Sequence, residues 1–90
     1  MKKSFNFGII GCSQIAKTST IPAILESRKA KLGHIGSREI TKSAKFAKKF
    51  RCKKFGSYDD VLDDKDVDVV YISLPIALHE KWTIKAAKKG

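Results

Sequence analysis

The chain has 90 residues, of which 42% are hydrophobic and 31% are charged, and its formal net charge is +10. This composition is typical of one folded globular domain and excludes an intrinsically disordered chain. The longest apolar runs have about six residues, far fewer than the ~20 of a membrane-spanning helix. The first residues lack the apolar core of a signal peptide, so we expect a cytoplasmic protein.

The positive charge does not by itself indicate a nucleic-acid-binding protein. The lysines recur along several segments, as they do on the solvated faces of amphipathic helices, and no aromatic side chains for base stacking lie between them. Solvated helix faces are therefore the favoured interpretation. A basic nucleic-acid-binding protein is the less favoured alternative.

Metal and disulfide chemistry are not indicated either. Neither Cys12 nor Cys52 has a histidine or cysteine at a ligand spacing, and we expect the two cysteines at opposite edges of the fold. The six aspartates between Asp59 and Asp68 lack the glycine and the final glutamate of a calcium loop. We expect these aspartates to cap helices and contact solvent.

The first half of the chain alternates between strand and helix patterns. Residues 5–10 are apolar at nearly every position, which predicts a strand buried on both faces of a parallel sheet. Residues 14–28 carry apolar side chains at loosely helical spacing, and Pro22 within them predicts a short helix, a kink and a second helix. Residues 31–37 predict a second strand, in which His34 has a structural role.

The alternation continues through the middle of the chain. Apolar side chains recur every three residues over residues 41–50, which predicts a surface helix with Thr41 as its N-cap. Residues 53–58 then predict a brief third strand. Asp59 and Asp60 open a short helical turn, where acidic side chains favour the positive end of the helix dipole.

The last segments give the strongest strand and a long helix. Residues 67–74 are rich in β-branched and aromatic side chains and predict a strand that ends at Pro75. Residues 77–89 predict a helix with Leu78, Trp82 and Ile84 toward the core, and Gly90 stands in the C′ position.

Alternating strands and helices predict an α/β fold. We expect a Rossmann-type parallel sheet with flanking helices, with about four strands in the order 3-2-1-4. The sheet is incomplete, because a further strand would follow the last helix. Residues 1–90 are therefore interpreted as a partial dinucleotide-binding domain, with the substrate domain absent.

The turn after the first strand predicts a phosphate-binding site. Residues 11–16 read Gly-x-Ser-x-x-Ala between a strand and a helix, a variant of the dinucleotide-binding fingerprint. Gly11 permits the tight turn, Ser13 is small and carries a hydroxyl donor, and Ala16 permits close packing of helix on strand. An ordinary turn of small residues is the alternative, and the strand and helix context favours nucleotide binding.

The loop after the second strand indicates the type of cofactor. Domains specific for NAD place an acidic residue here, whereas this chain has Ser37 and Arg38. A guanidinium pairs bidentately with a 2′-phosphate, and Ser37 and Lys42 would support it, so NADP is favoured. Glu39 keeps NAD open as the second choice, because its carboxylate could take the acidic role.

Several motifs occur along nearly the whole chain in the order of one known family. They are Gly8-Ile-Ile-Gly11-Cys12-Ser13-x-Ile15-Ala16, Pro22-Ala23-Ile24, Ser37-Arg38, Ala44-x-x-Ala47-x-x-Phe50, Ser57-Tyr58, Val67-Asp68-x-Val70-Tyr71-Ile72 and Leu74-Pro75-x-x-x-His79. Together they resemble the amino-terminal half of the cofactor domain in the glucose-fructose oxidoreductase, inositol dehydrogenase and rhizopine catabolism family.

The resemblance implies an NAD(P)-dependent oxidoreductase that acts on a sugar, cyclitol or similar polyol, with a two-domain subunit that usually forms homo-oligomers. It assigns the turn after the first strand to the pyrophosphate, the loop after the second to the adenosine ribose and its phosphate, and the loop after the fourth to the middle and nicotinamide side of the cofactor. The expected cofactor-binding residues are Gly11, Cys12, Ser13, Gln14, Ile15, Ala16, Ser37, Arg38, Lys42, Ser73, Leu74, Pro75 and His79. For His79, packing against the core is an equal alternative.

Two residues depart from the family pattern: Ser13 stands where the family usually has glycine, and Ile76 stands where it usually has asparagine. The family's catalytic lysine lies in a Glu-Lys-Pro motif that does not occur in this chain. We therefore assign no catalytic residue and expect the chain alone to bind nucleotide without turnover. A stand-alone nucleotide-binding or redox-sensing module without catalysis is the alternative.

Overall fold

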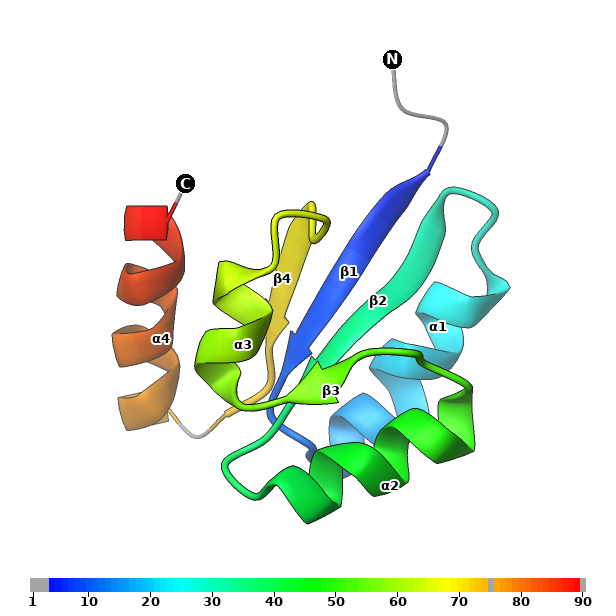
Figure 1. Cartoon of the computed structure of the whole chain (residues 1–90), viewed down its shortest axis with the longest axis horizontal. Coiled ribbons are helices and arrows are strands. Elements are labelled where there is room, and N and C mark those ends of the chain that lie inside the picture. Colours follow the sequence, from blue (N-terminus) through cyan, green and yellow to red (C-terminus); the bar gives the residue numbers. More distant parts are fainter. Residues whose placement is uncertain (1–3, 75, 90) are drawn as a thin grey trace.

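The computed structural model describes residues 4–74 and 76–89, and its centre is a four-stranded parallel sheet (Figure 1). The strands are β1 (Phe5–Ile10), β2 (Ala30–Gly36), β3 (Phe55–Gly56) and β4 (Val69–Ile72). Their order across the sheet is β3-β2-β1-β4, which confirms the predicted Rossmann-type α/β fold. The first strand lies inside the sheet, and β3 and β4 form its edges.

Helices cover both faces of the sheet (Figure 1). They are a π-helical turn η1 (Ala16–Thr20), α1 (Ile21–Glu26), α2 (Ile40–Phe50), α3 (Tyr58–Asp63) and α4 (Ile76–Lys89). The helices α1 and α2 lie on one side, and α3 and α4 lie on the other. The connections that leave β1 in the two directions therefore use opposite faces, which makes the gap between the ends of β1 and β4 the switch point of the topology. In the part of the chain described, no helix is both long and apolar enough to span a bilayer.

The buried core lies mainly between the sheet and the α1 and α2 side. Ile9 and Ile35 are fully buried there, on neighbouring strands paired in register. The cluster consists of Ile9, Ala16, Ile21, Ile24, Ile35, Ala47 and Cys52. On the opposite face, position 8 has no room for a side chain, because a Cβ atom at Gly8 would lie 2.6 Å from the Val61 side chain of α3. This missing side chain lets α3 pack directly on the sheet.

The helix expected at residues 41–50 begins one residue earlier, at Ile40, and the prediction that Thr41 is its N-cap is wrong. Glu39 occupies the N-cap position and makes no side-chain capping hydrogen bond. The chain turns into the helix directly from the loop after β2, where the Ser37 hydroxyl accepts a hydrogen bond from the Glu39 amide at 3.2 Å. Thr41 is therefore already helical.

The kink expected at Pro22 is a π-helical turn. Helical structure runs through residues 14–26 without a break, and the turn widens over Ala16–Thr20. The Ile21 amide donates to the Ala16 carbonyl, five residues earlier. Pro22 has no amide hydrogen to donate to the preceding turn, and a wider turn accommodates its ring without ending the helix.

The third strand is shorter than expected because the chain turns into α3 at Ser57. The Ser57 hydroxyl accepts from the Asp60 amide at 3.2 Å, and the Asp60 carboxylate accepts from the Ser57 amide at 2.8 Å. This reciprocal pair is a capping box, and it removes Ser57 and Tyr58 from the strand. Likewise, the strand expected at residues 67–74 is limited to β4. Pro75 and Gly90 lie outside the described residues.

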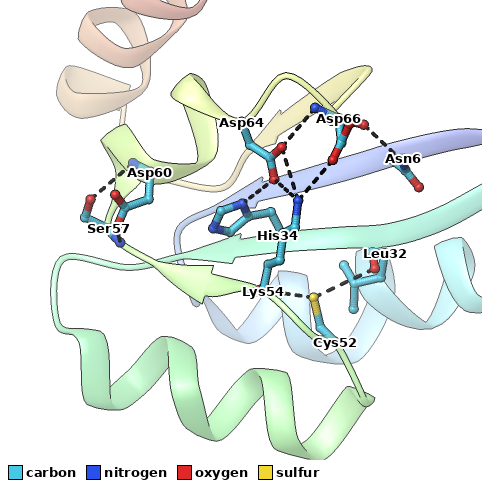
Figure 2. A network of polar contacts seen from close by, with 9 residues as sticks. All are labelled: Asn6, Leu32, His34, Cys52, Lys54, Ser57, Asp60, Asp64 and Asp66. Carbon is cyan, nitrogen blue, oxygen red and sulfur yellow. Dashed lines mark hydrogen bonds and ion pairs between the residues drawn. The ribbon is translucent and has the colours of Figure 1, made fainter.

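A polar network joins β2 to the loop that follows α3 (Figure 2). The Asp64 carboxylate is 10% exposed and accepts hydrogen bonds from His34 Nδ1 at 2.8 Å, Lys54 Nζ at 3.1 Å and the Asp66 amide at 2.9 Å. Lys54 also pairs with the Asp66 carboxylate at 3.2 Å. Burial by itself raises the pKa of Asp64, but the three donors together lower it to about 2.

The low pKa of Asp64 predicts that the fold loses stability in acid. A carboxyl group with a pKa of about 2 when folded and 3.8 when unfolded stabilises the chain by roughly 2 kcal/mol above about pH 4, and this contribution disappears as the pH falls through about 2. We expect Asp64→Asn to lose less unfolding free energy than wild type between about pH 5 and pH 2, measured by urea denaturation.

Asp59→Asn is the matched control, because the Asp59 side chain is 63% exposed. It should keep the acid sensitivity of the wild type. If Asp64→Asn and wild type lost equal stability in acid, the assignment to Asp64 would be wrong.

The turn after β1 lies directly against the end of β4. Gly11 has φ +104°, and a Cβ atom there would lie 2.2 Å from the Ser73 carbonyl oxygen. The Gly11 amide donates to the Gly36 carbonyl at 3.0 Å, and the Ser73 amide donates to the Ile10 carbonyl at 2.8 Å. Only glycine satisfies both the backbone conformation and the space at this position.

We expect Gly11→Ala to lower the free energy of unfolding by at least about 2 kcal/mol, since it combines a strained φ with a steric clash against backbone. Urea denaturation with matched m values measures the loss. Gly33→Ala is the control, because a Cβ atom there meets nothing closer than the Asn6 Cβ at 3.2 Å. Equal losses in the two variants would contradict this account of Gly11.

Candidate functional site

A cavity of about 240 Å³ opens at the carboxyl ends of β1, β2 and β4. It lies at the switch point between β1 and β4, where open parallel sheets bind their ligands. Its lining comes from the loops after β1, β2 and β4 and from the starts of α2, α3 and α4: Gly11, Cys12, Ser13, Ser37, Arg38, Glu39, Lys42, Tyr58, Ser73, Leu74 and Leu78. The structure thus brings together the three loops that the sequence singles out.

The loop after β1 leads into a capped helix. The Ser13 hydroxyl accepts a hydrogen bond from the Ala16 amide at 3.1 Å, and the Ser13 carbonyl accepts from the Lys17 amide at 3.1 Å. Ser13 therefore acts as the N-cap of the helical run. Ala16 is fully buried in the core cluster with Ile9, so its small side chain allows the helix to pack closely on the strand.

The hydroxyl groups of Ser13 and Ser73 are hydrogen-bonded to each other. This contact connects the loop after β1 with the loop after β4 at the side of the cavity. The two residues are 60 positions apart in the sequence. Only the folded chain therefore brings these two hydroxyls together.

The loop after β2 carries the charged part of the lining. Ser37 is buried, with its amide donating to the Gly56 carbonyl at 2.9 Å, which fixes the start of the loop. Arg38, Glu39 and Lys42 follow with exposed side chains around the cavity. Two cations and one carboxylate give this wall a net positive charge at neutral pH, which suits an anionic ligand.

Cys12 lines the cavity as a half-buried free thiol. Burial raises the pKa of Cys12, and the Ser37 side chain and the charge of Lys42 only partly oppose this effect. The thiol is therefore protonated at neutral pH and is a weak nucleophile. Cys52, the second free cysteine, is buried in the core, where its thiol donates to the Lys54 carbonyl at 3.2 Å.

Not every residue expected at the site lines the cavity. Gln14 and Ile15 are exposed in the first helical turn, outside the lining. His79 is exposed and borders a separate cavity with Tyr71 and Thr83, where its ring nitrogen Nδ1 lies 3.3 Å from the Thr83 hydroxyl. Pro75 lies outside the described residues. The role of His79 toward a cofactor stays a prediction.

Two lining residues were not expected at the site. Tyr58 begins α3, and its ring packs edge-on against Trp82 with 4.9 Å between centroids. Leu78 and Ile84 are predicted in the core with Trp82, but both are exposed, Leu78 beside the cavity, whereas Trp82 is buried as predicted. The Ser57-Tyr58 motif was the one sequence signal for Tyr58. No pattern distinguished Leu78 from a core residue.

No group of three or more His, Cys, Asp or Glu side chains among residues 4–74 and 76–89 has the arrangement of a metal site. The aspartates after β3 have other contacts: Asp60 caps α3, Asp64 and Asp66 bind Lys54, and Asp68 accepts from the Asn6 amide at 2.9 Å. The cavity at the switch point instead includes hydroxyls, two cations and backbone groups, which suit phosphate.

Comparison with known proteins identifies the family. The family model described as "Oxidoreductase family, NAD-binding Rossmann fold" matches residues 5–90. An uncharacterised oxidoreductase of Rhizobium meliloti is 39% identical over 85 residues, covering 93% of this chain and 25% of that protein. A dTDP-3,4-didehydro-2,6-dideoxy-alpha-D-glucose 3-reductase of Streptomyces violaceoruber is 36% identical over 88 residues, covering 98% of this chain and 26% of the relative.

A solved structure agrees over the same region. The crystal structure of KijD10, a 3-ketoreductase from Actinomadura kijaniata in complex with NADP and TDP-benzene, superposes with a TM-score of 0.91 at 31% identity, over 97% of this chain and 27% of that chain. The chain thus spans about a quarter of the length of the proteins that it matches. It belongs to the GFO_IDH_MocA oxidoreductase family and carries the NAD-binding Rossmann fold of that family, which confirms the resemblance seen in its motifs.

Proposed function

We propose that this chain is the part of an NADP-dependent oxidoreductase that binds the adenosine and pyrophosphate portions of the cofactor. The observation that carries the proposal is the cavity at the switch point, where a glycine turn and helix start meet a loop with two cations. KijD10, whose fold matches over nearly the whole chain, was crystallised with NADP, and this supports the same ligand here.

The lining residues divide by chemistry. The turn over residues 11–16 would hold the pyrophosphate, because backbone amides at a helix start favour anions. Arg38 and Lys42 would hold the 2′-phosphate, with the guanidinium able to form two parallel hydrogen bonds. Tyr58 and Leu78 supply an apolar side to the cavity, suited to a base.

Among the described lining residues Glu39 is the one carboxylate, and it opposes a 2′-phosphate by charge repulsion. Arg38 and Lys42 outnumber it on the same wall, so we place NADP before NAD. The cofactor choice therefore depends on the two cations more than on the glycine turn.

The cavity supplies only part of a complete site. Its volume of about 240 Å³ is below the roughly 300–1,000 Å³ of pockets that enclose whole small ligands. We place the nicotinamide and the substrate outside this cavity. The cofactor, when bound, supplies hydride transfer to or from a carbonyl carbon. A sugar, cyclitol or polyol-like substrate is proposed, in line with the deoxysugar reductases among the relatives.

The chain by itself is proposed to bind the cofactor without turning over a substrate. The Glu-Lys-Pro motif with the lysine that the family resemblance makes catalytic does not occur in its sequence. The described lining offers hydroxyls, a protonated thiol and cations, and we assign none of them to proton transfer.

Calorimetric titration of the chain with NADPH and NADH tests the proposal. We expect saturable binding of both, with NADPH the tighter ligand, because the 2′-phosphate adds charge-assisted hydrogen bonds. Circular dichroism shows that the sample is folded. A folded sample that binds neither nucleotide would overturn the proposed function.

Arg38→Ala tests the cofactor choice. We expect it to weaken NADPH roughly tenfold or more and NADH less than about threefold, since only NADPH loses a hydrogen bond between charged groups. Arg28→Ala removes the same charge in the exposed turn before β2, at the amino ends of the strands and so opposite the cavity, and should leave both affinities unchanged. Equal losses of NADPH and NADH affinity in Arg38→Ala would contradict the role of Arg38.

A further inference from the structure

The Ser13–Ser73 hydrogen bond lies at the point where the proposed pyrophosphate would sit. Both residues line the cavity, and their hydroxyls contact each other across the switch point. Glycine is the usual residue of the dinucleotide fingerprint at this part of the turn, so the Ser13 hydroxyl is an additional group in a phosphate site. The hydroxyl pair therefore adds two polar groups that the dinucleotide-binding fingerprint does not include.

Backbone hydrogen bonds hold the Ser13 hydroxyl and the main chain of Ser73. Ser13 is held from one side, because its oxygen accepts from the Ala16 amide at 3.1 Å. Ser73 is held from the other side by its amide, which donates to the Ile10 carbonyl at 2.8 Å. The close approach of Gly11 to the Ser73 carbonyl sets the separation of the two loops. The Ser13 hydroxyl cannot rotate out of the pair without losing its hydrogen bond from the Ala16 amide.

The hydroxyl hydrogens of Ser13 and Ser73 determine how many hydrogen bonds the pair can donate to a ligand. Two serine hydroxyls carry two O–H donors, and their mutual hydrogen bond uses one of them, whichever residue donates. The Ala16 amide uses an acceptor position on Ser13 and no donor. Among the described residues, no hydrogen bond uses the remaining O–H of the pair. One donor is left at the edge of the cavity.

We propose that Ser13 and Ser73 act as one donor unit, in which each serine positions the other and the remaining O–H donates to a phosphate oxygen of the pyrophosphate. This inference rests on the proposed function. An anionic oxygen is the acceptor that such a donor favours, because a hydrogen bond to a charged group is roughly twice as strong as a neutral one. The unit depends on both hydroxyls together.

The unit predicts a particular pattern of affinities. Ser13→Ala and Ser73→Ala should each weaken NADPH about tenfold, and the double variant should bind about as weakly as either single one, because either substitution breaks the pair. Adenosine 2′-monophosphate lacks the pyrophosphate, so its affinity should change less than about twofold in all three variants. NADPH fluorescence, directly and in competition with adenosine 2′-monophosphate, gives both affinities.

Conservative and matched variants separate this role from a merely structural one. Ser73→Thr and Ser13→Thr keep the hydroxyl, and each should restore NADPH affinity to within about threefold of wild type, since threonine also caps helices. Ser19→Ala makes the same chemical change on an exposed helical position and should have no effect. Circular dichroism and urea denaturation show that each variant is folded.

The possible results lead to different conclusions. Wild-type chain that is folded and binds no nucleotide would overturn the proposed function and this inference with it. Wild type that binds NADPH, with both alanine variants binding it equally well, would overturn the donor unit alone. Losses that add in the double variant, or that extend equally to adenosine 2′-monophosphate, would also overturn it, because they indicate independent or general structural effects.

Discussion

The turn after β1 lies so close to the end of β4 that this contact determines the arrangement of the site around it. Gly11 adopts φ +104° with no room for a Cβ atom beside the Ser73 carbonyl. This contact joins two segments about 60 residues apart and sets the width of the switch point. It places Ser13, which caps the first helical run, beside Ser73. The cavity, the helix start and the hydroxyl pair all follow from one glycine that fits against one carbonyl group.

The two ends of the sheet have different chemistry. Away from the cavity, charges neutralise one another: Lys54 binds Asp64 and Asp66, and His34 binds Asp64 from inside the sheet (Figure 2). At the carboxyl ends of the strands, Arg38 and Lys42 line an open cavity. The first arrangement stabilises the fold, and the second leaves cations available to a ligand. The net charge of +10 is therefore compatible with a phosphate site of limited extent.

The sequence predicted those features that depend on local pattern. The alternation of strands and helices predicts the strand order and the parallel pairing. The positions of Gly11 and Arg38 directly after strands predict that they lie at the ligand edge of the sheet. Thr41 was assigned wrongly as a cap because residue preference alone does not show where a helix begins. Leu78 and His79 are adjacent on α4 and point about 100° apart, so the orientation of that helix about its own axis decides which one reaches the cavity. The Ser13–Ser73 contact could not be predicted, because it depends on how two distant loops pack.

The proposed nucleotide site lies at the switch point between β1 and β4. An amide NMR titration of the ¹⁵N-labelled chain with NADPH tests this position residue by residue. We expect the largest saturable shifts on residues 11–16, on the loop from Ser37 to Lys42, and on Ser73 and Leu74. The largest shifts would instead fall around Arg51, Lys53 and Lys54 if the ligand used the cavity that these residues line at the other end of the sheet. That second pattern would overturn binding at the switch point.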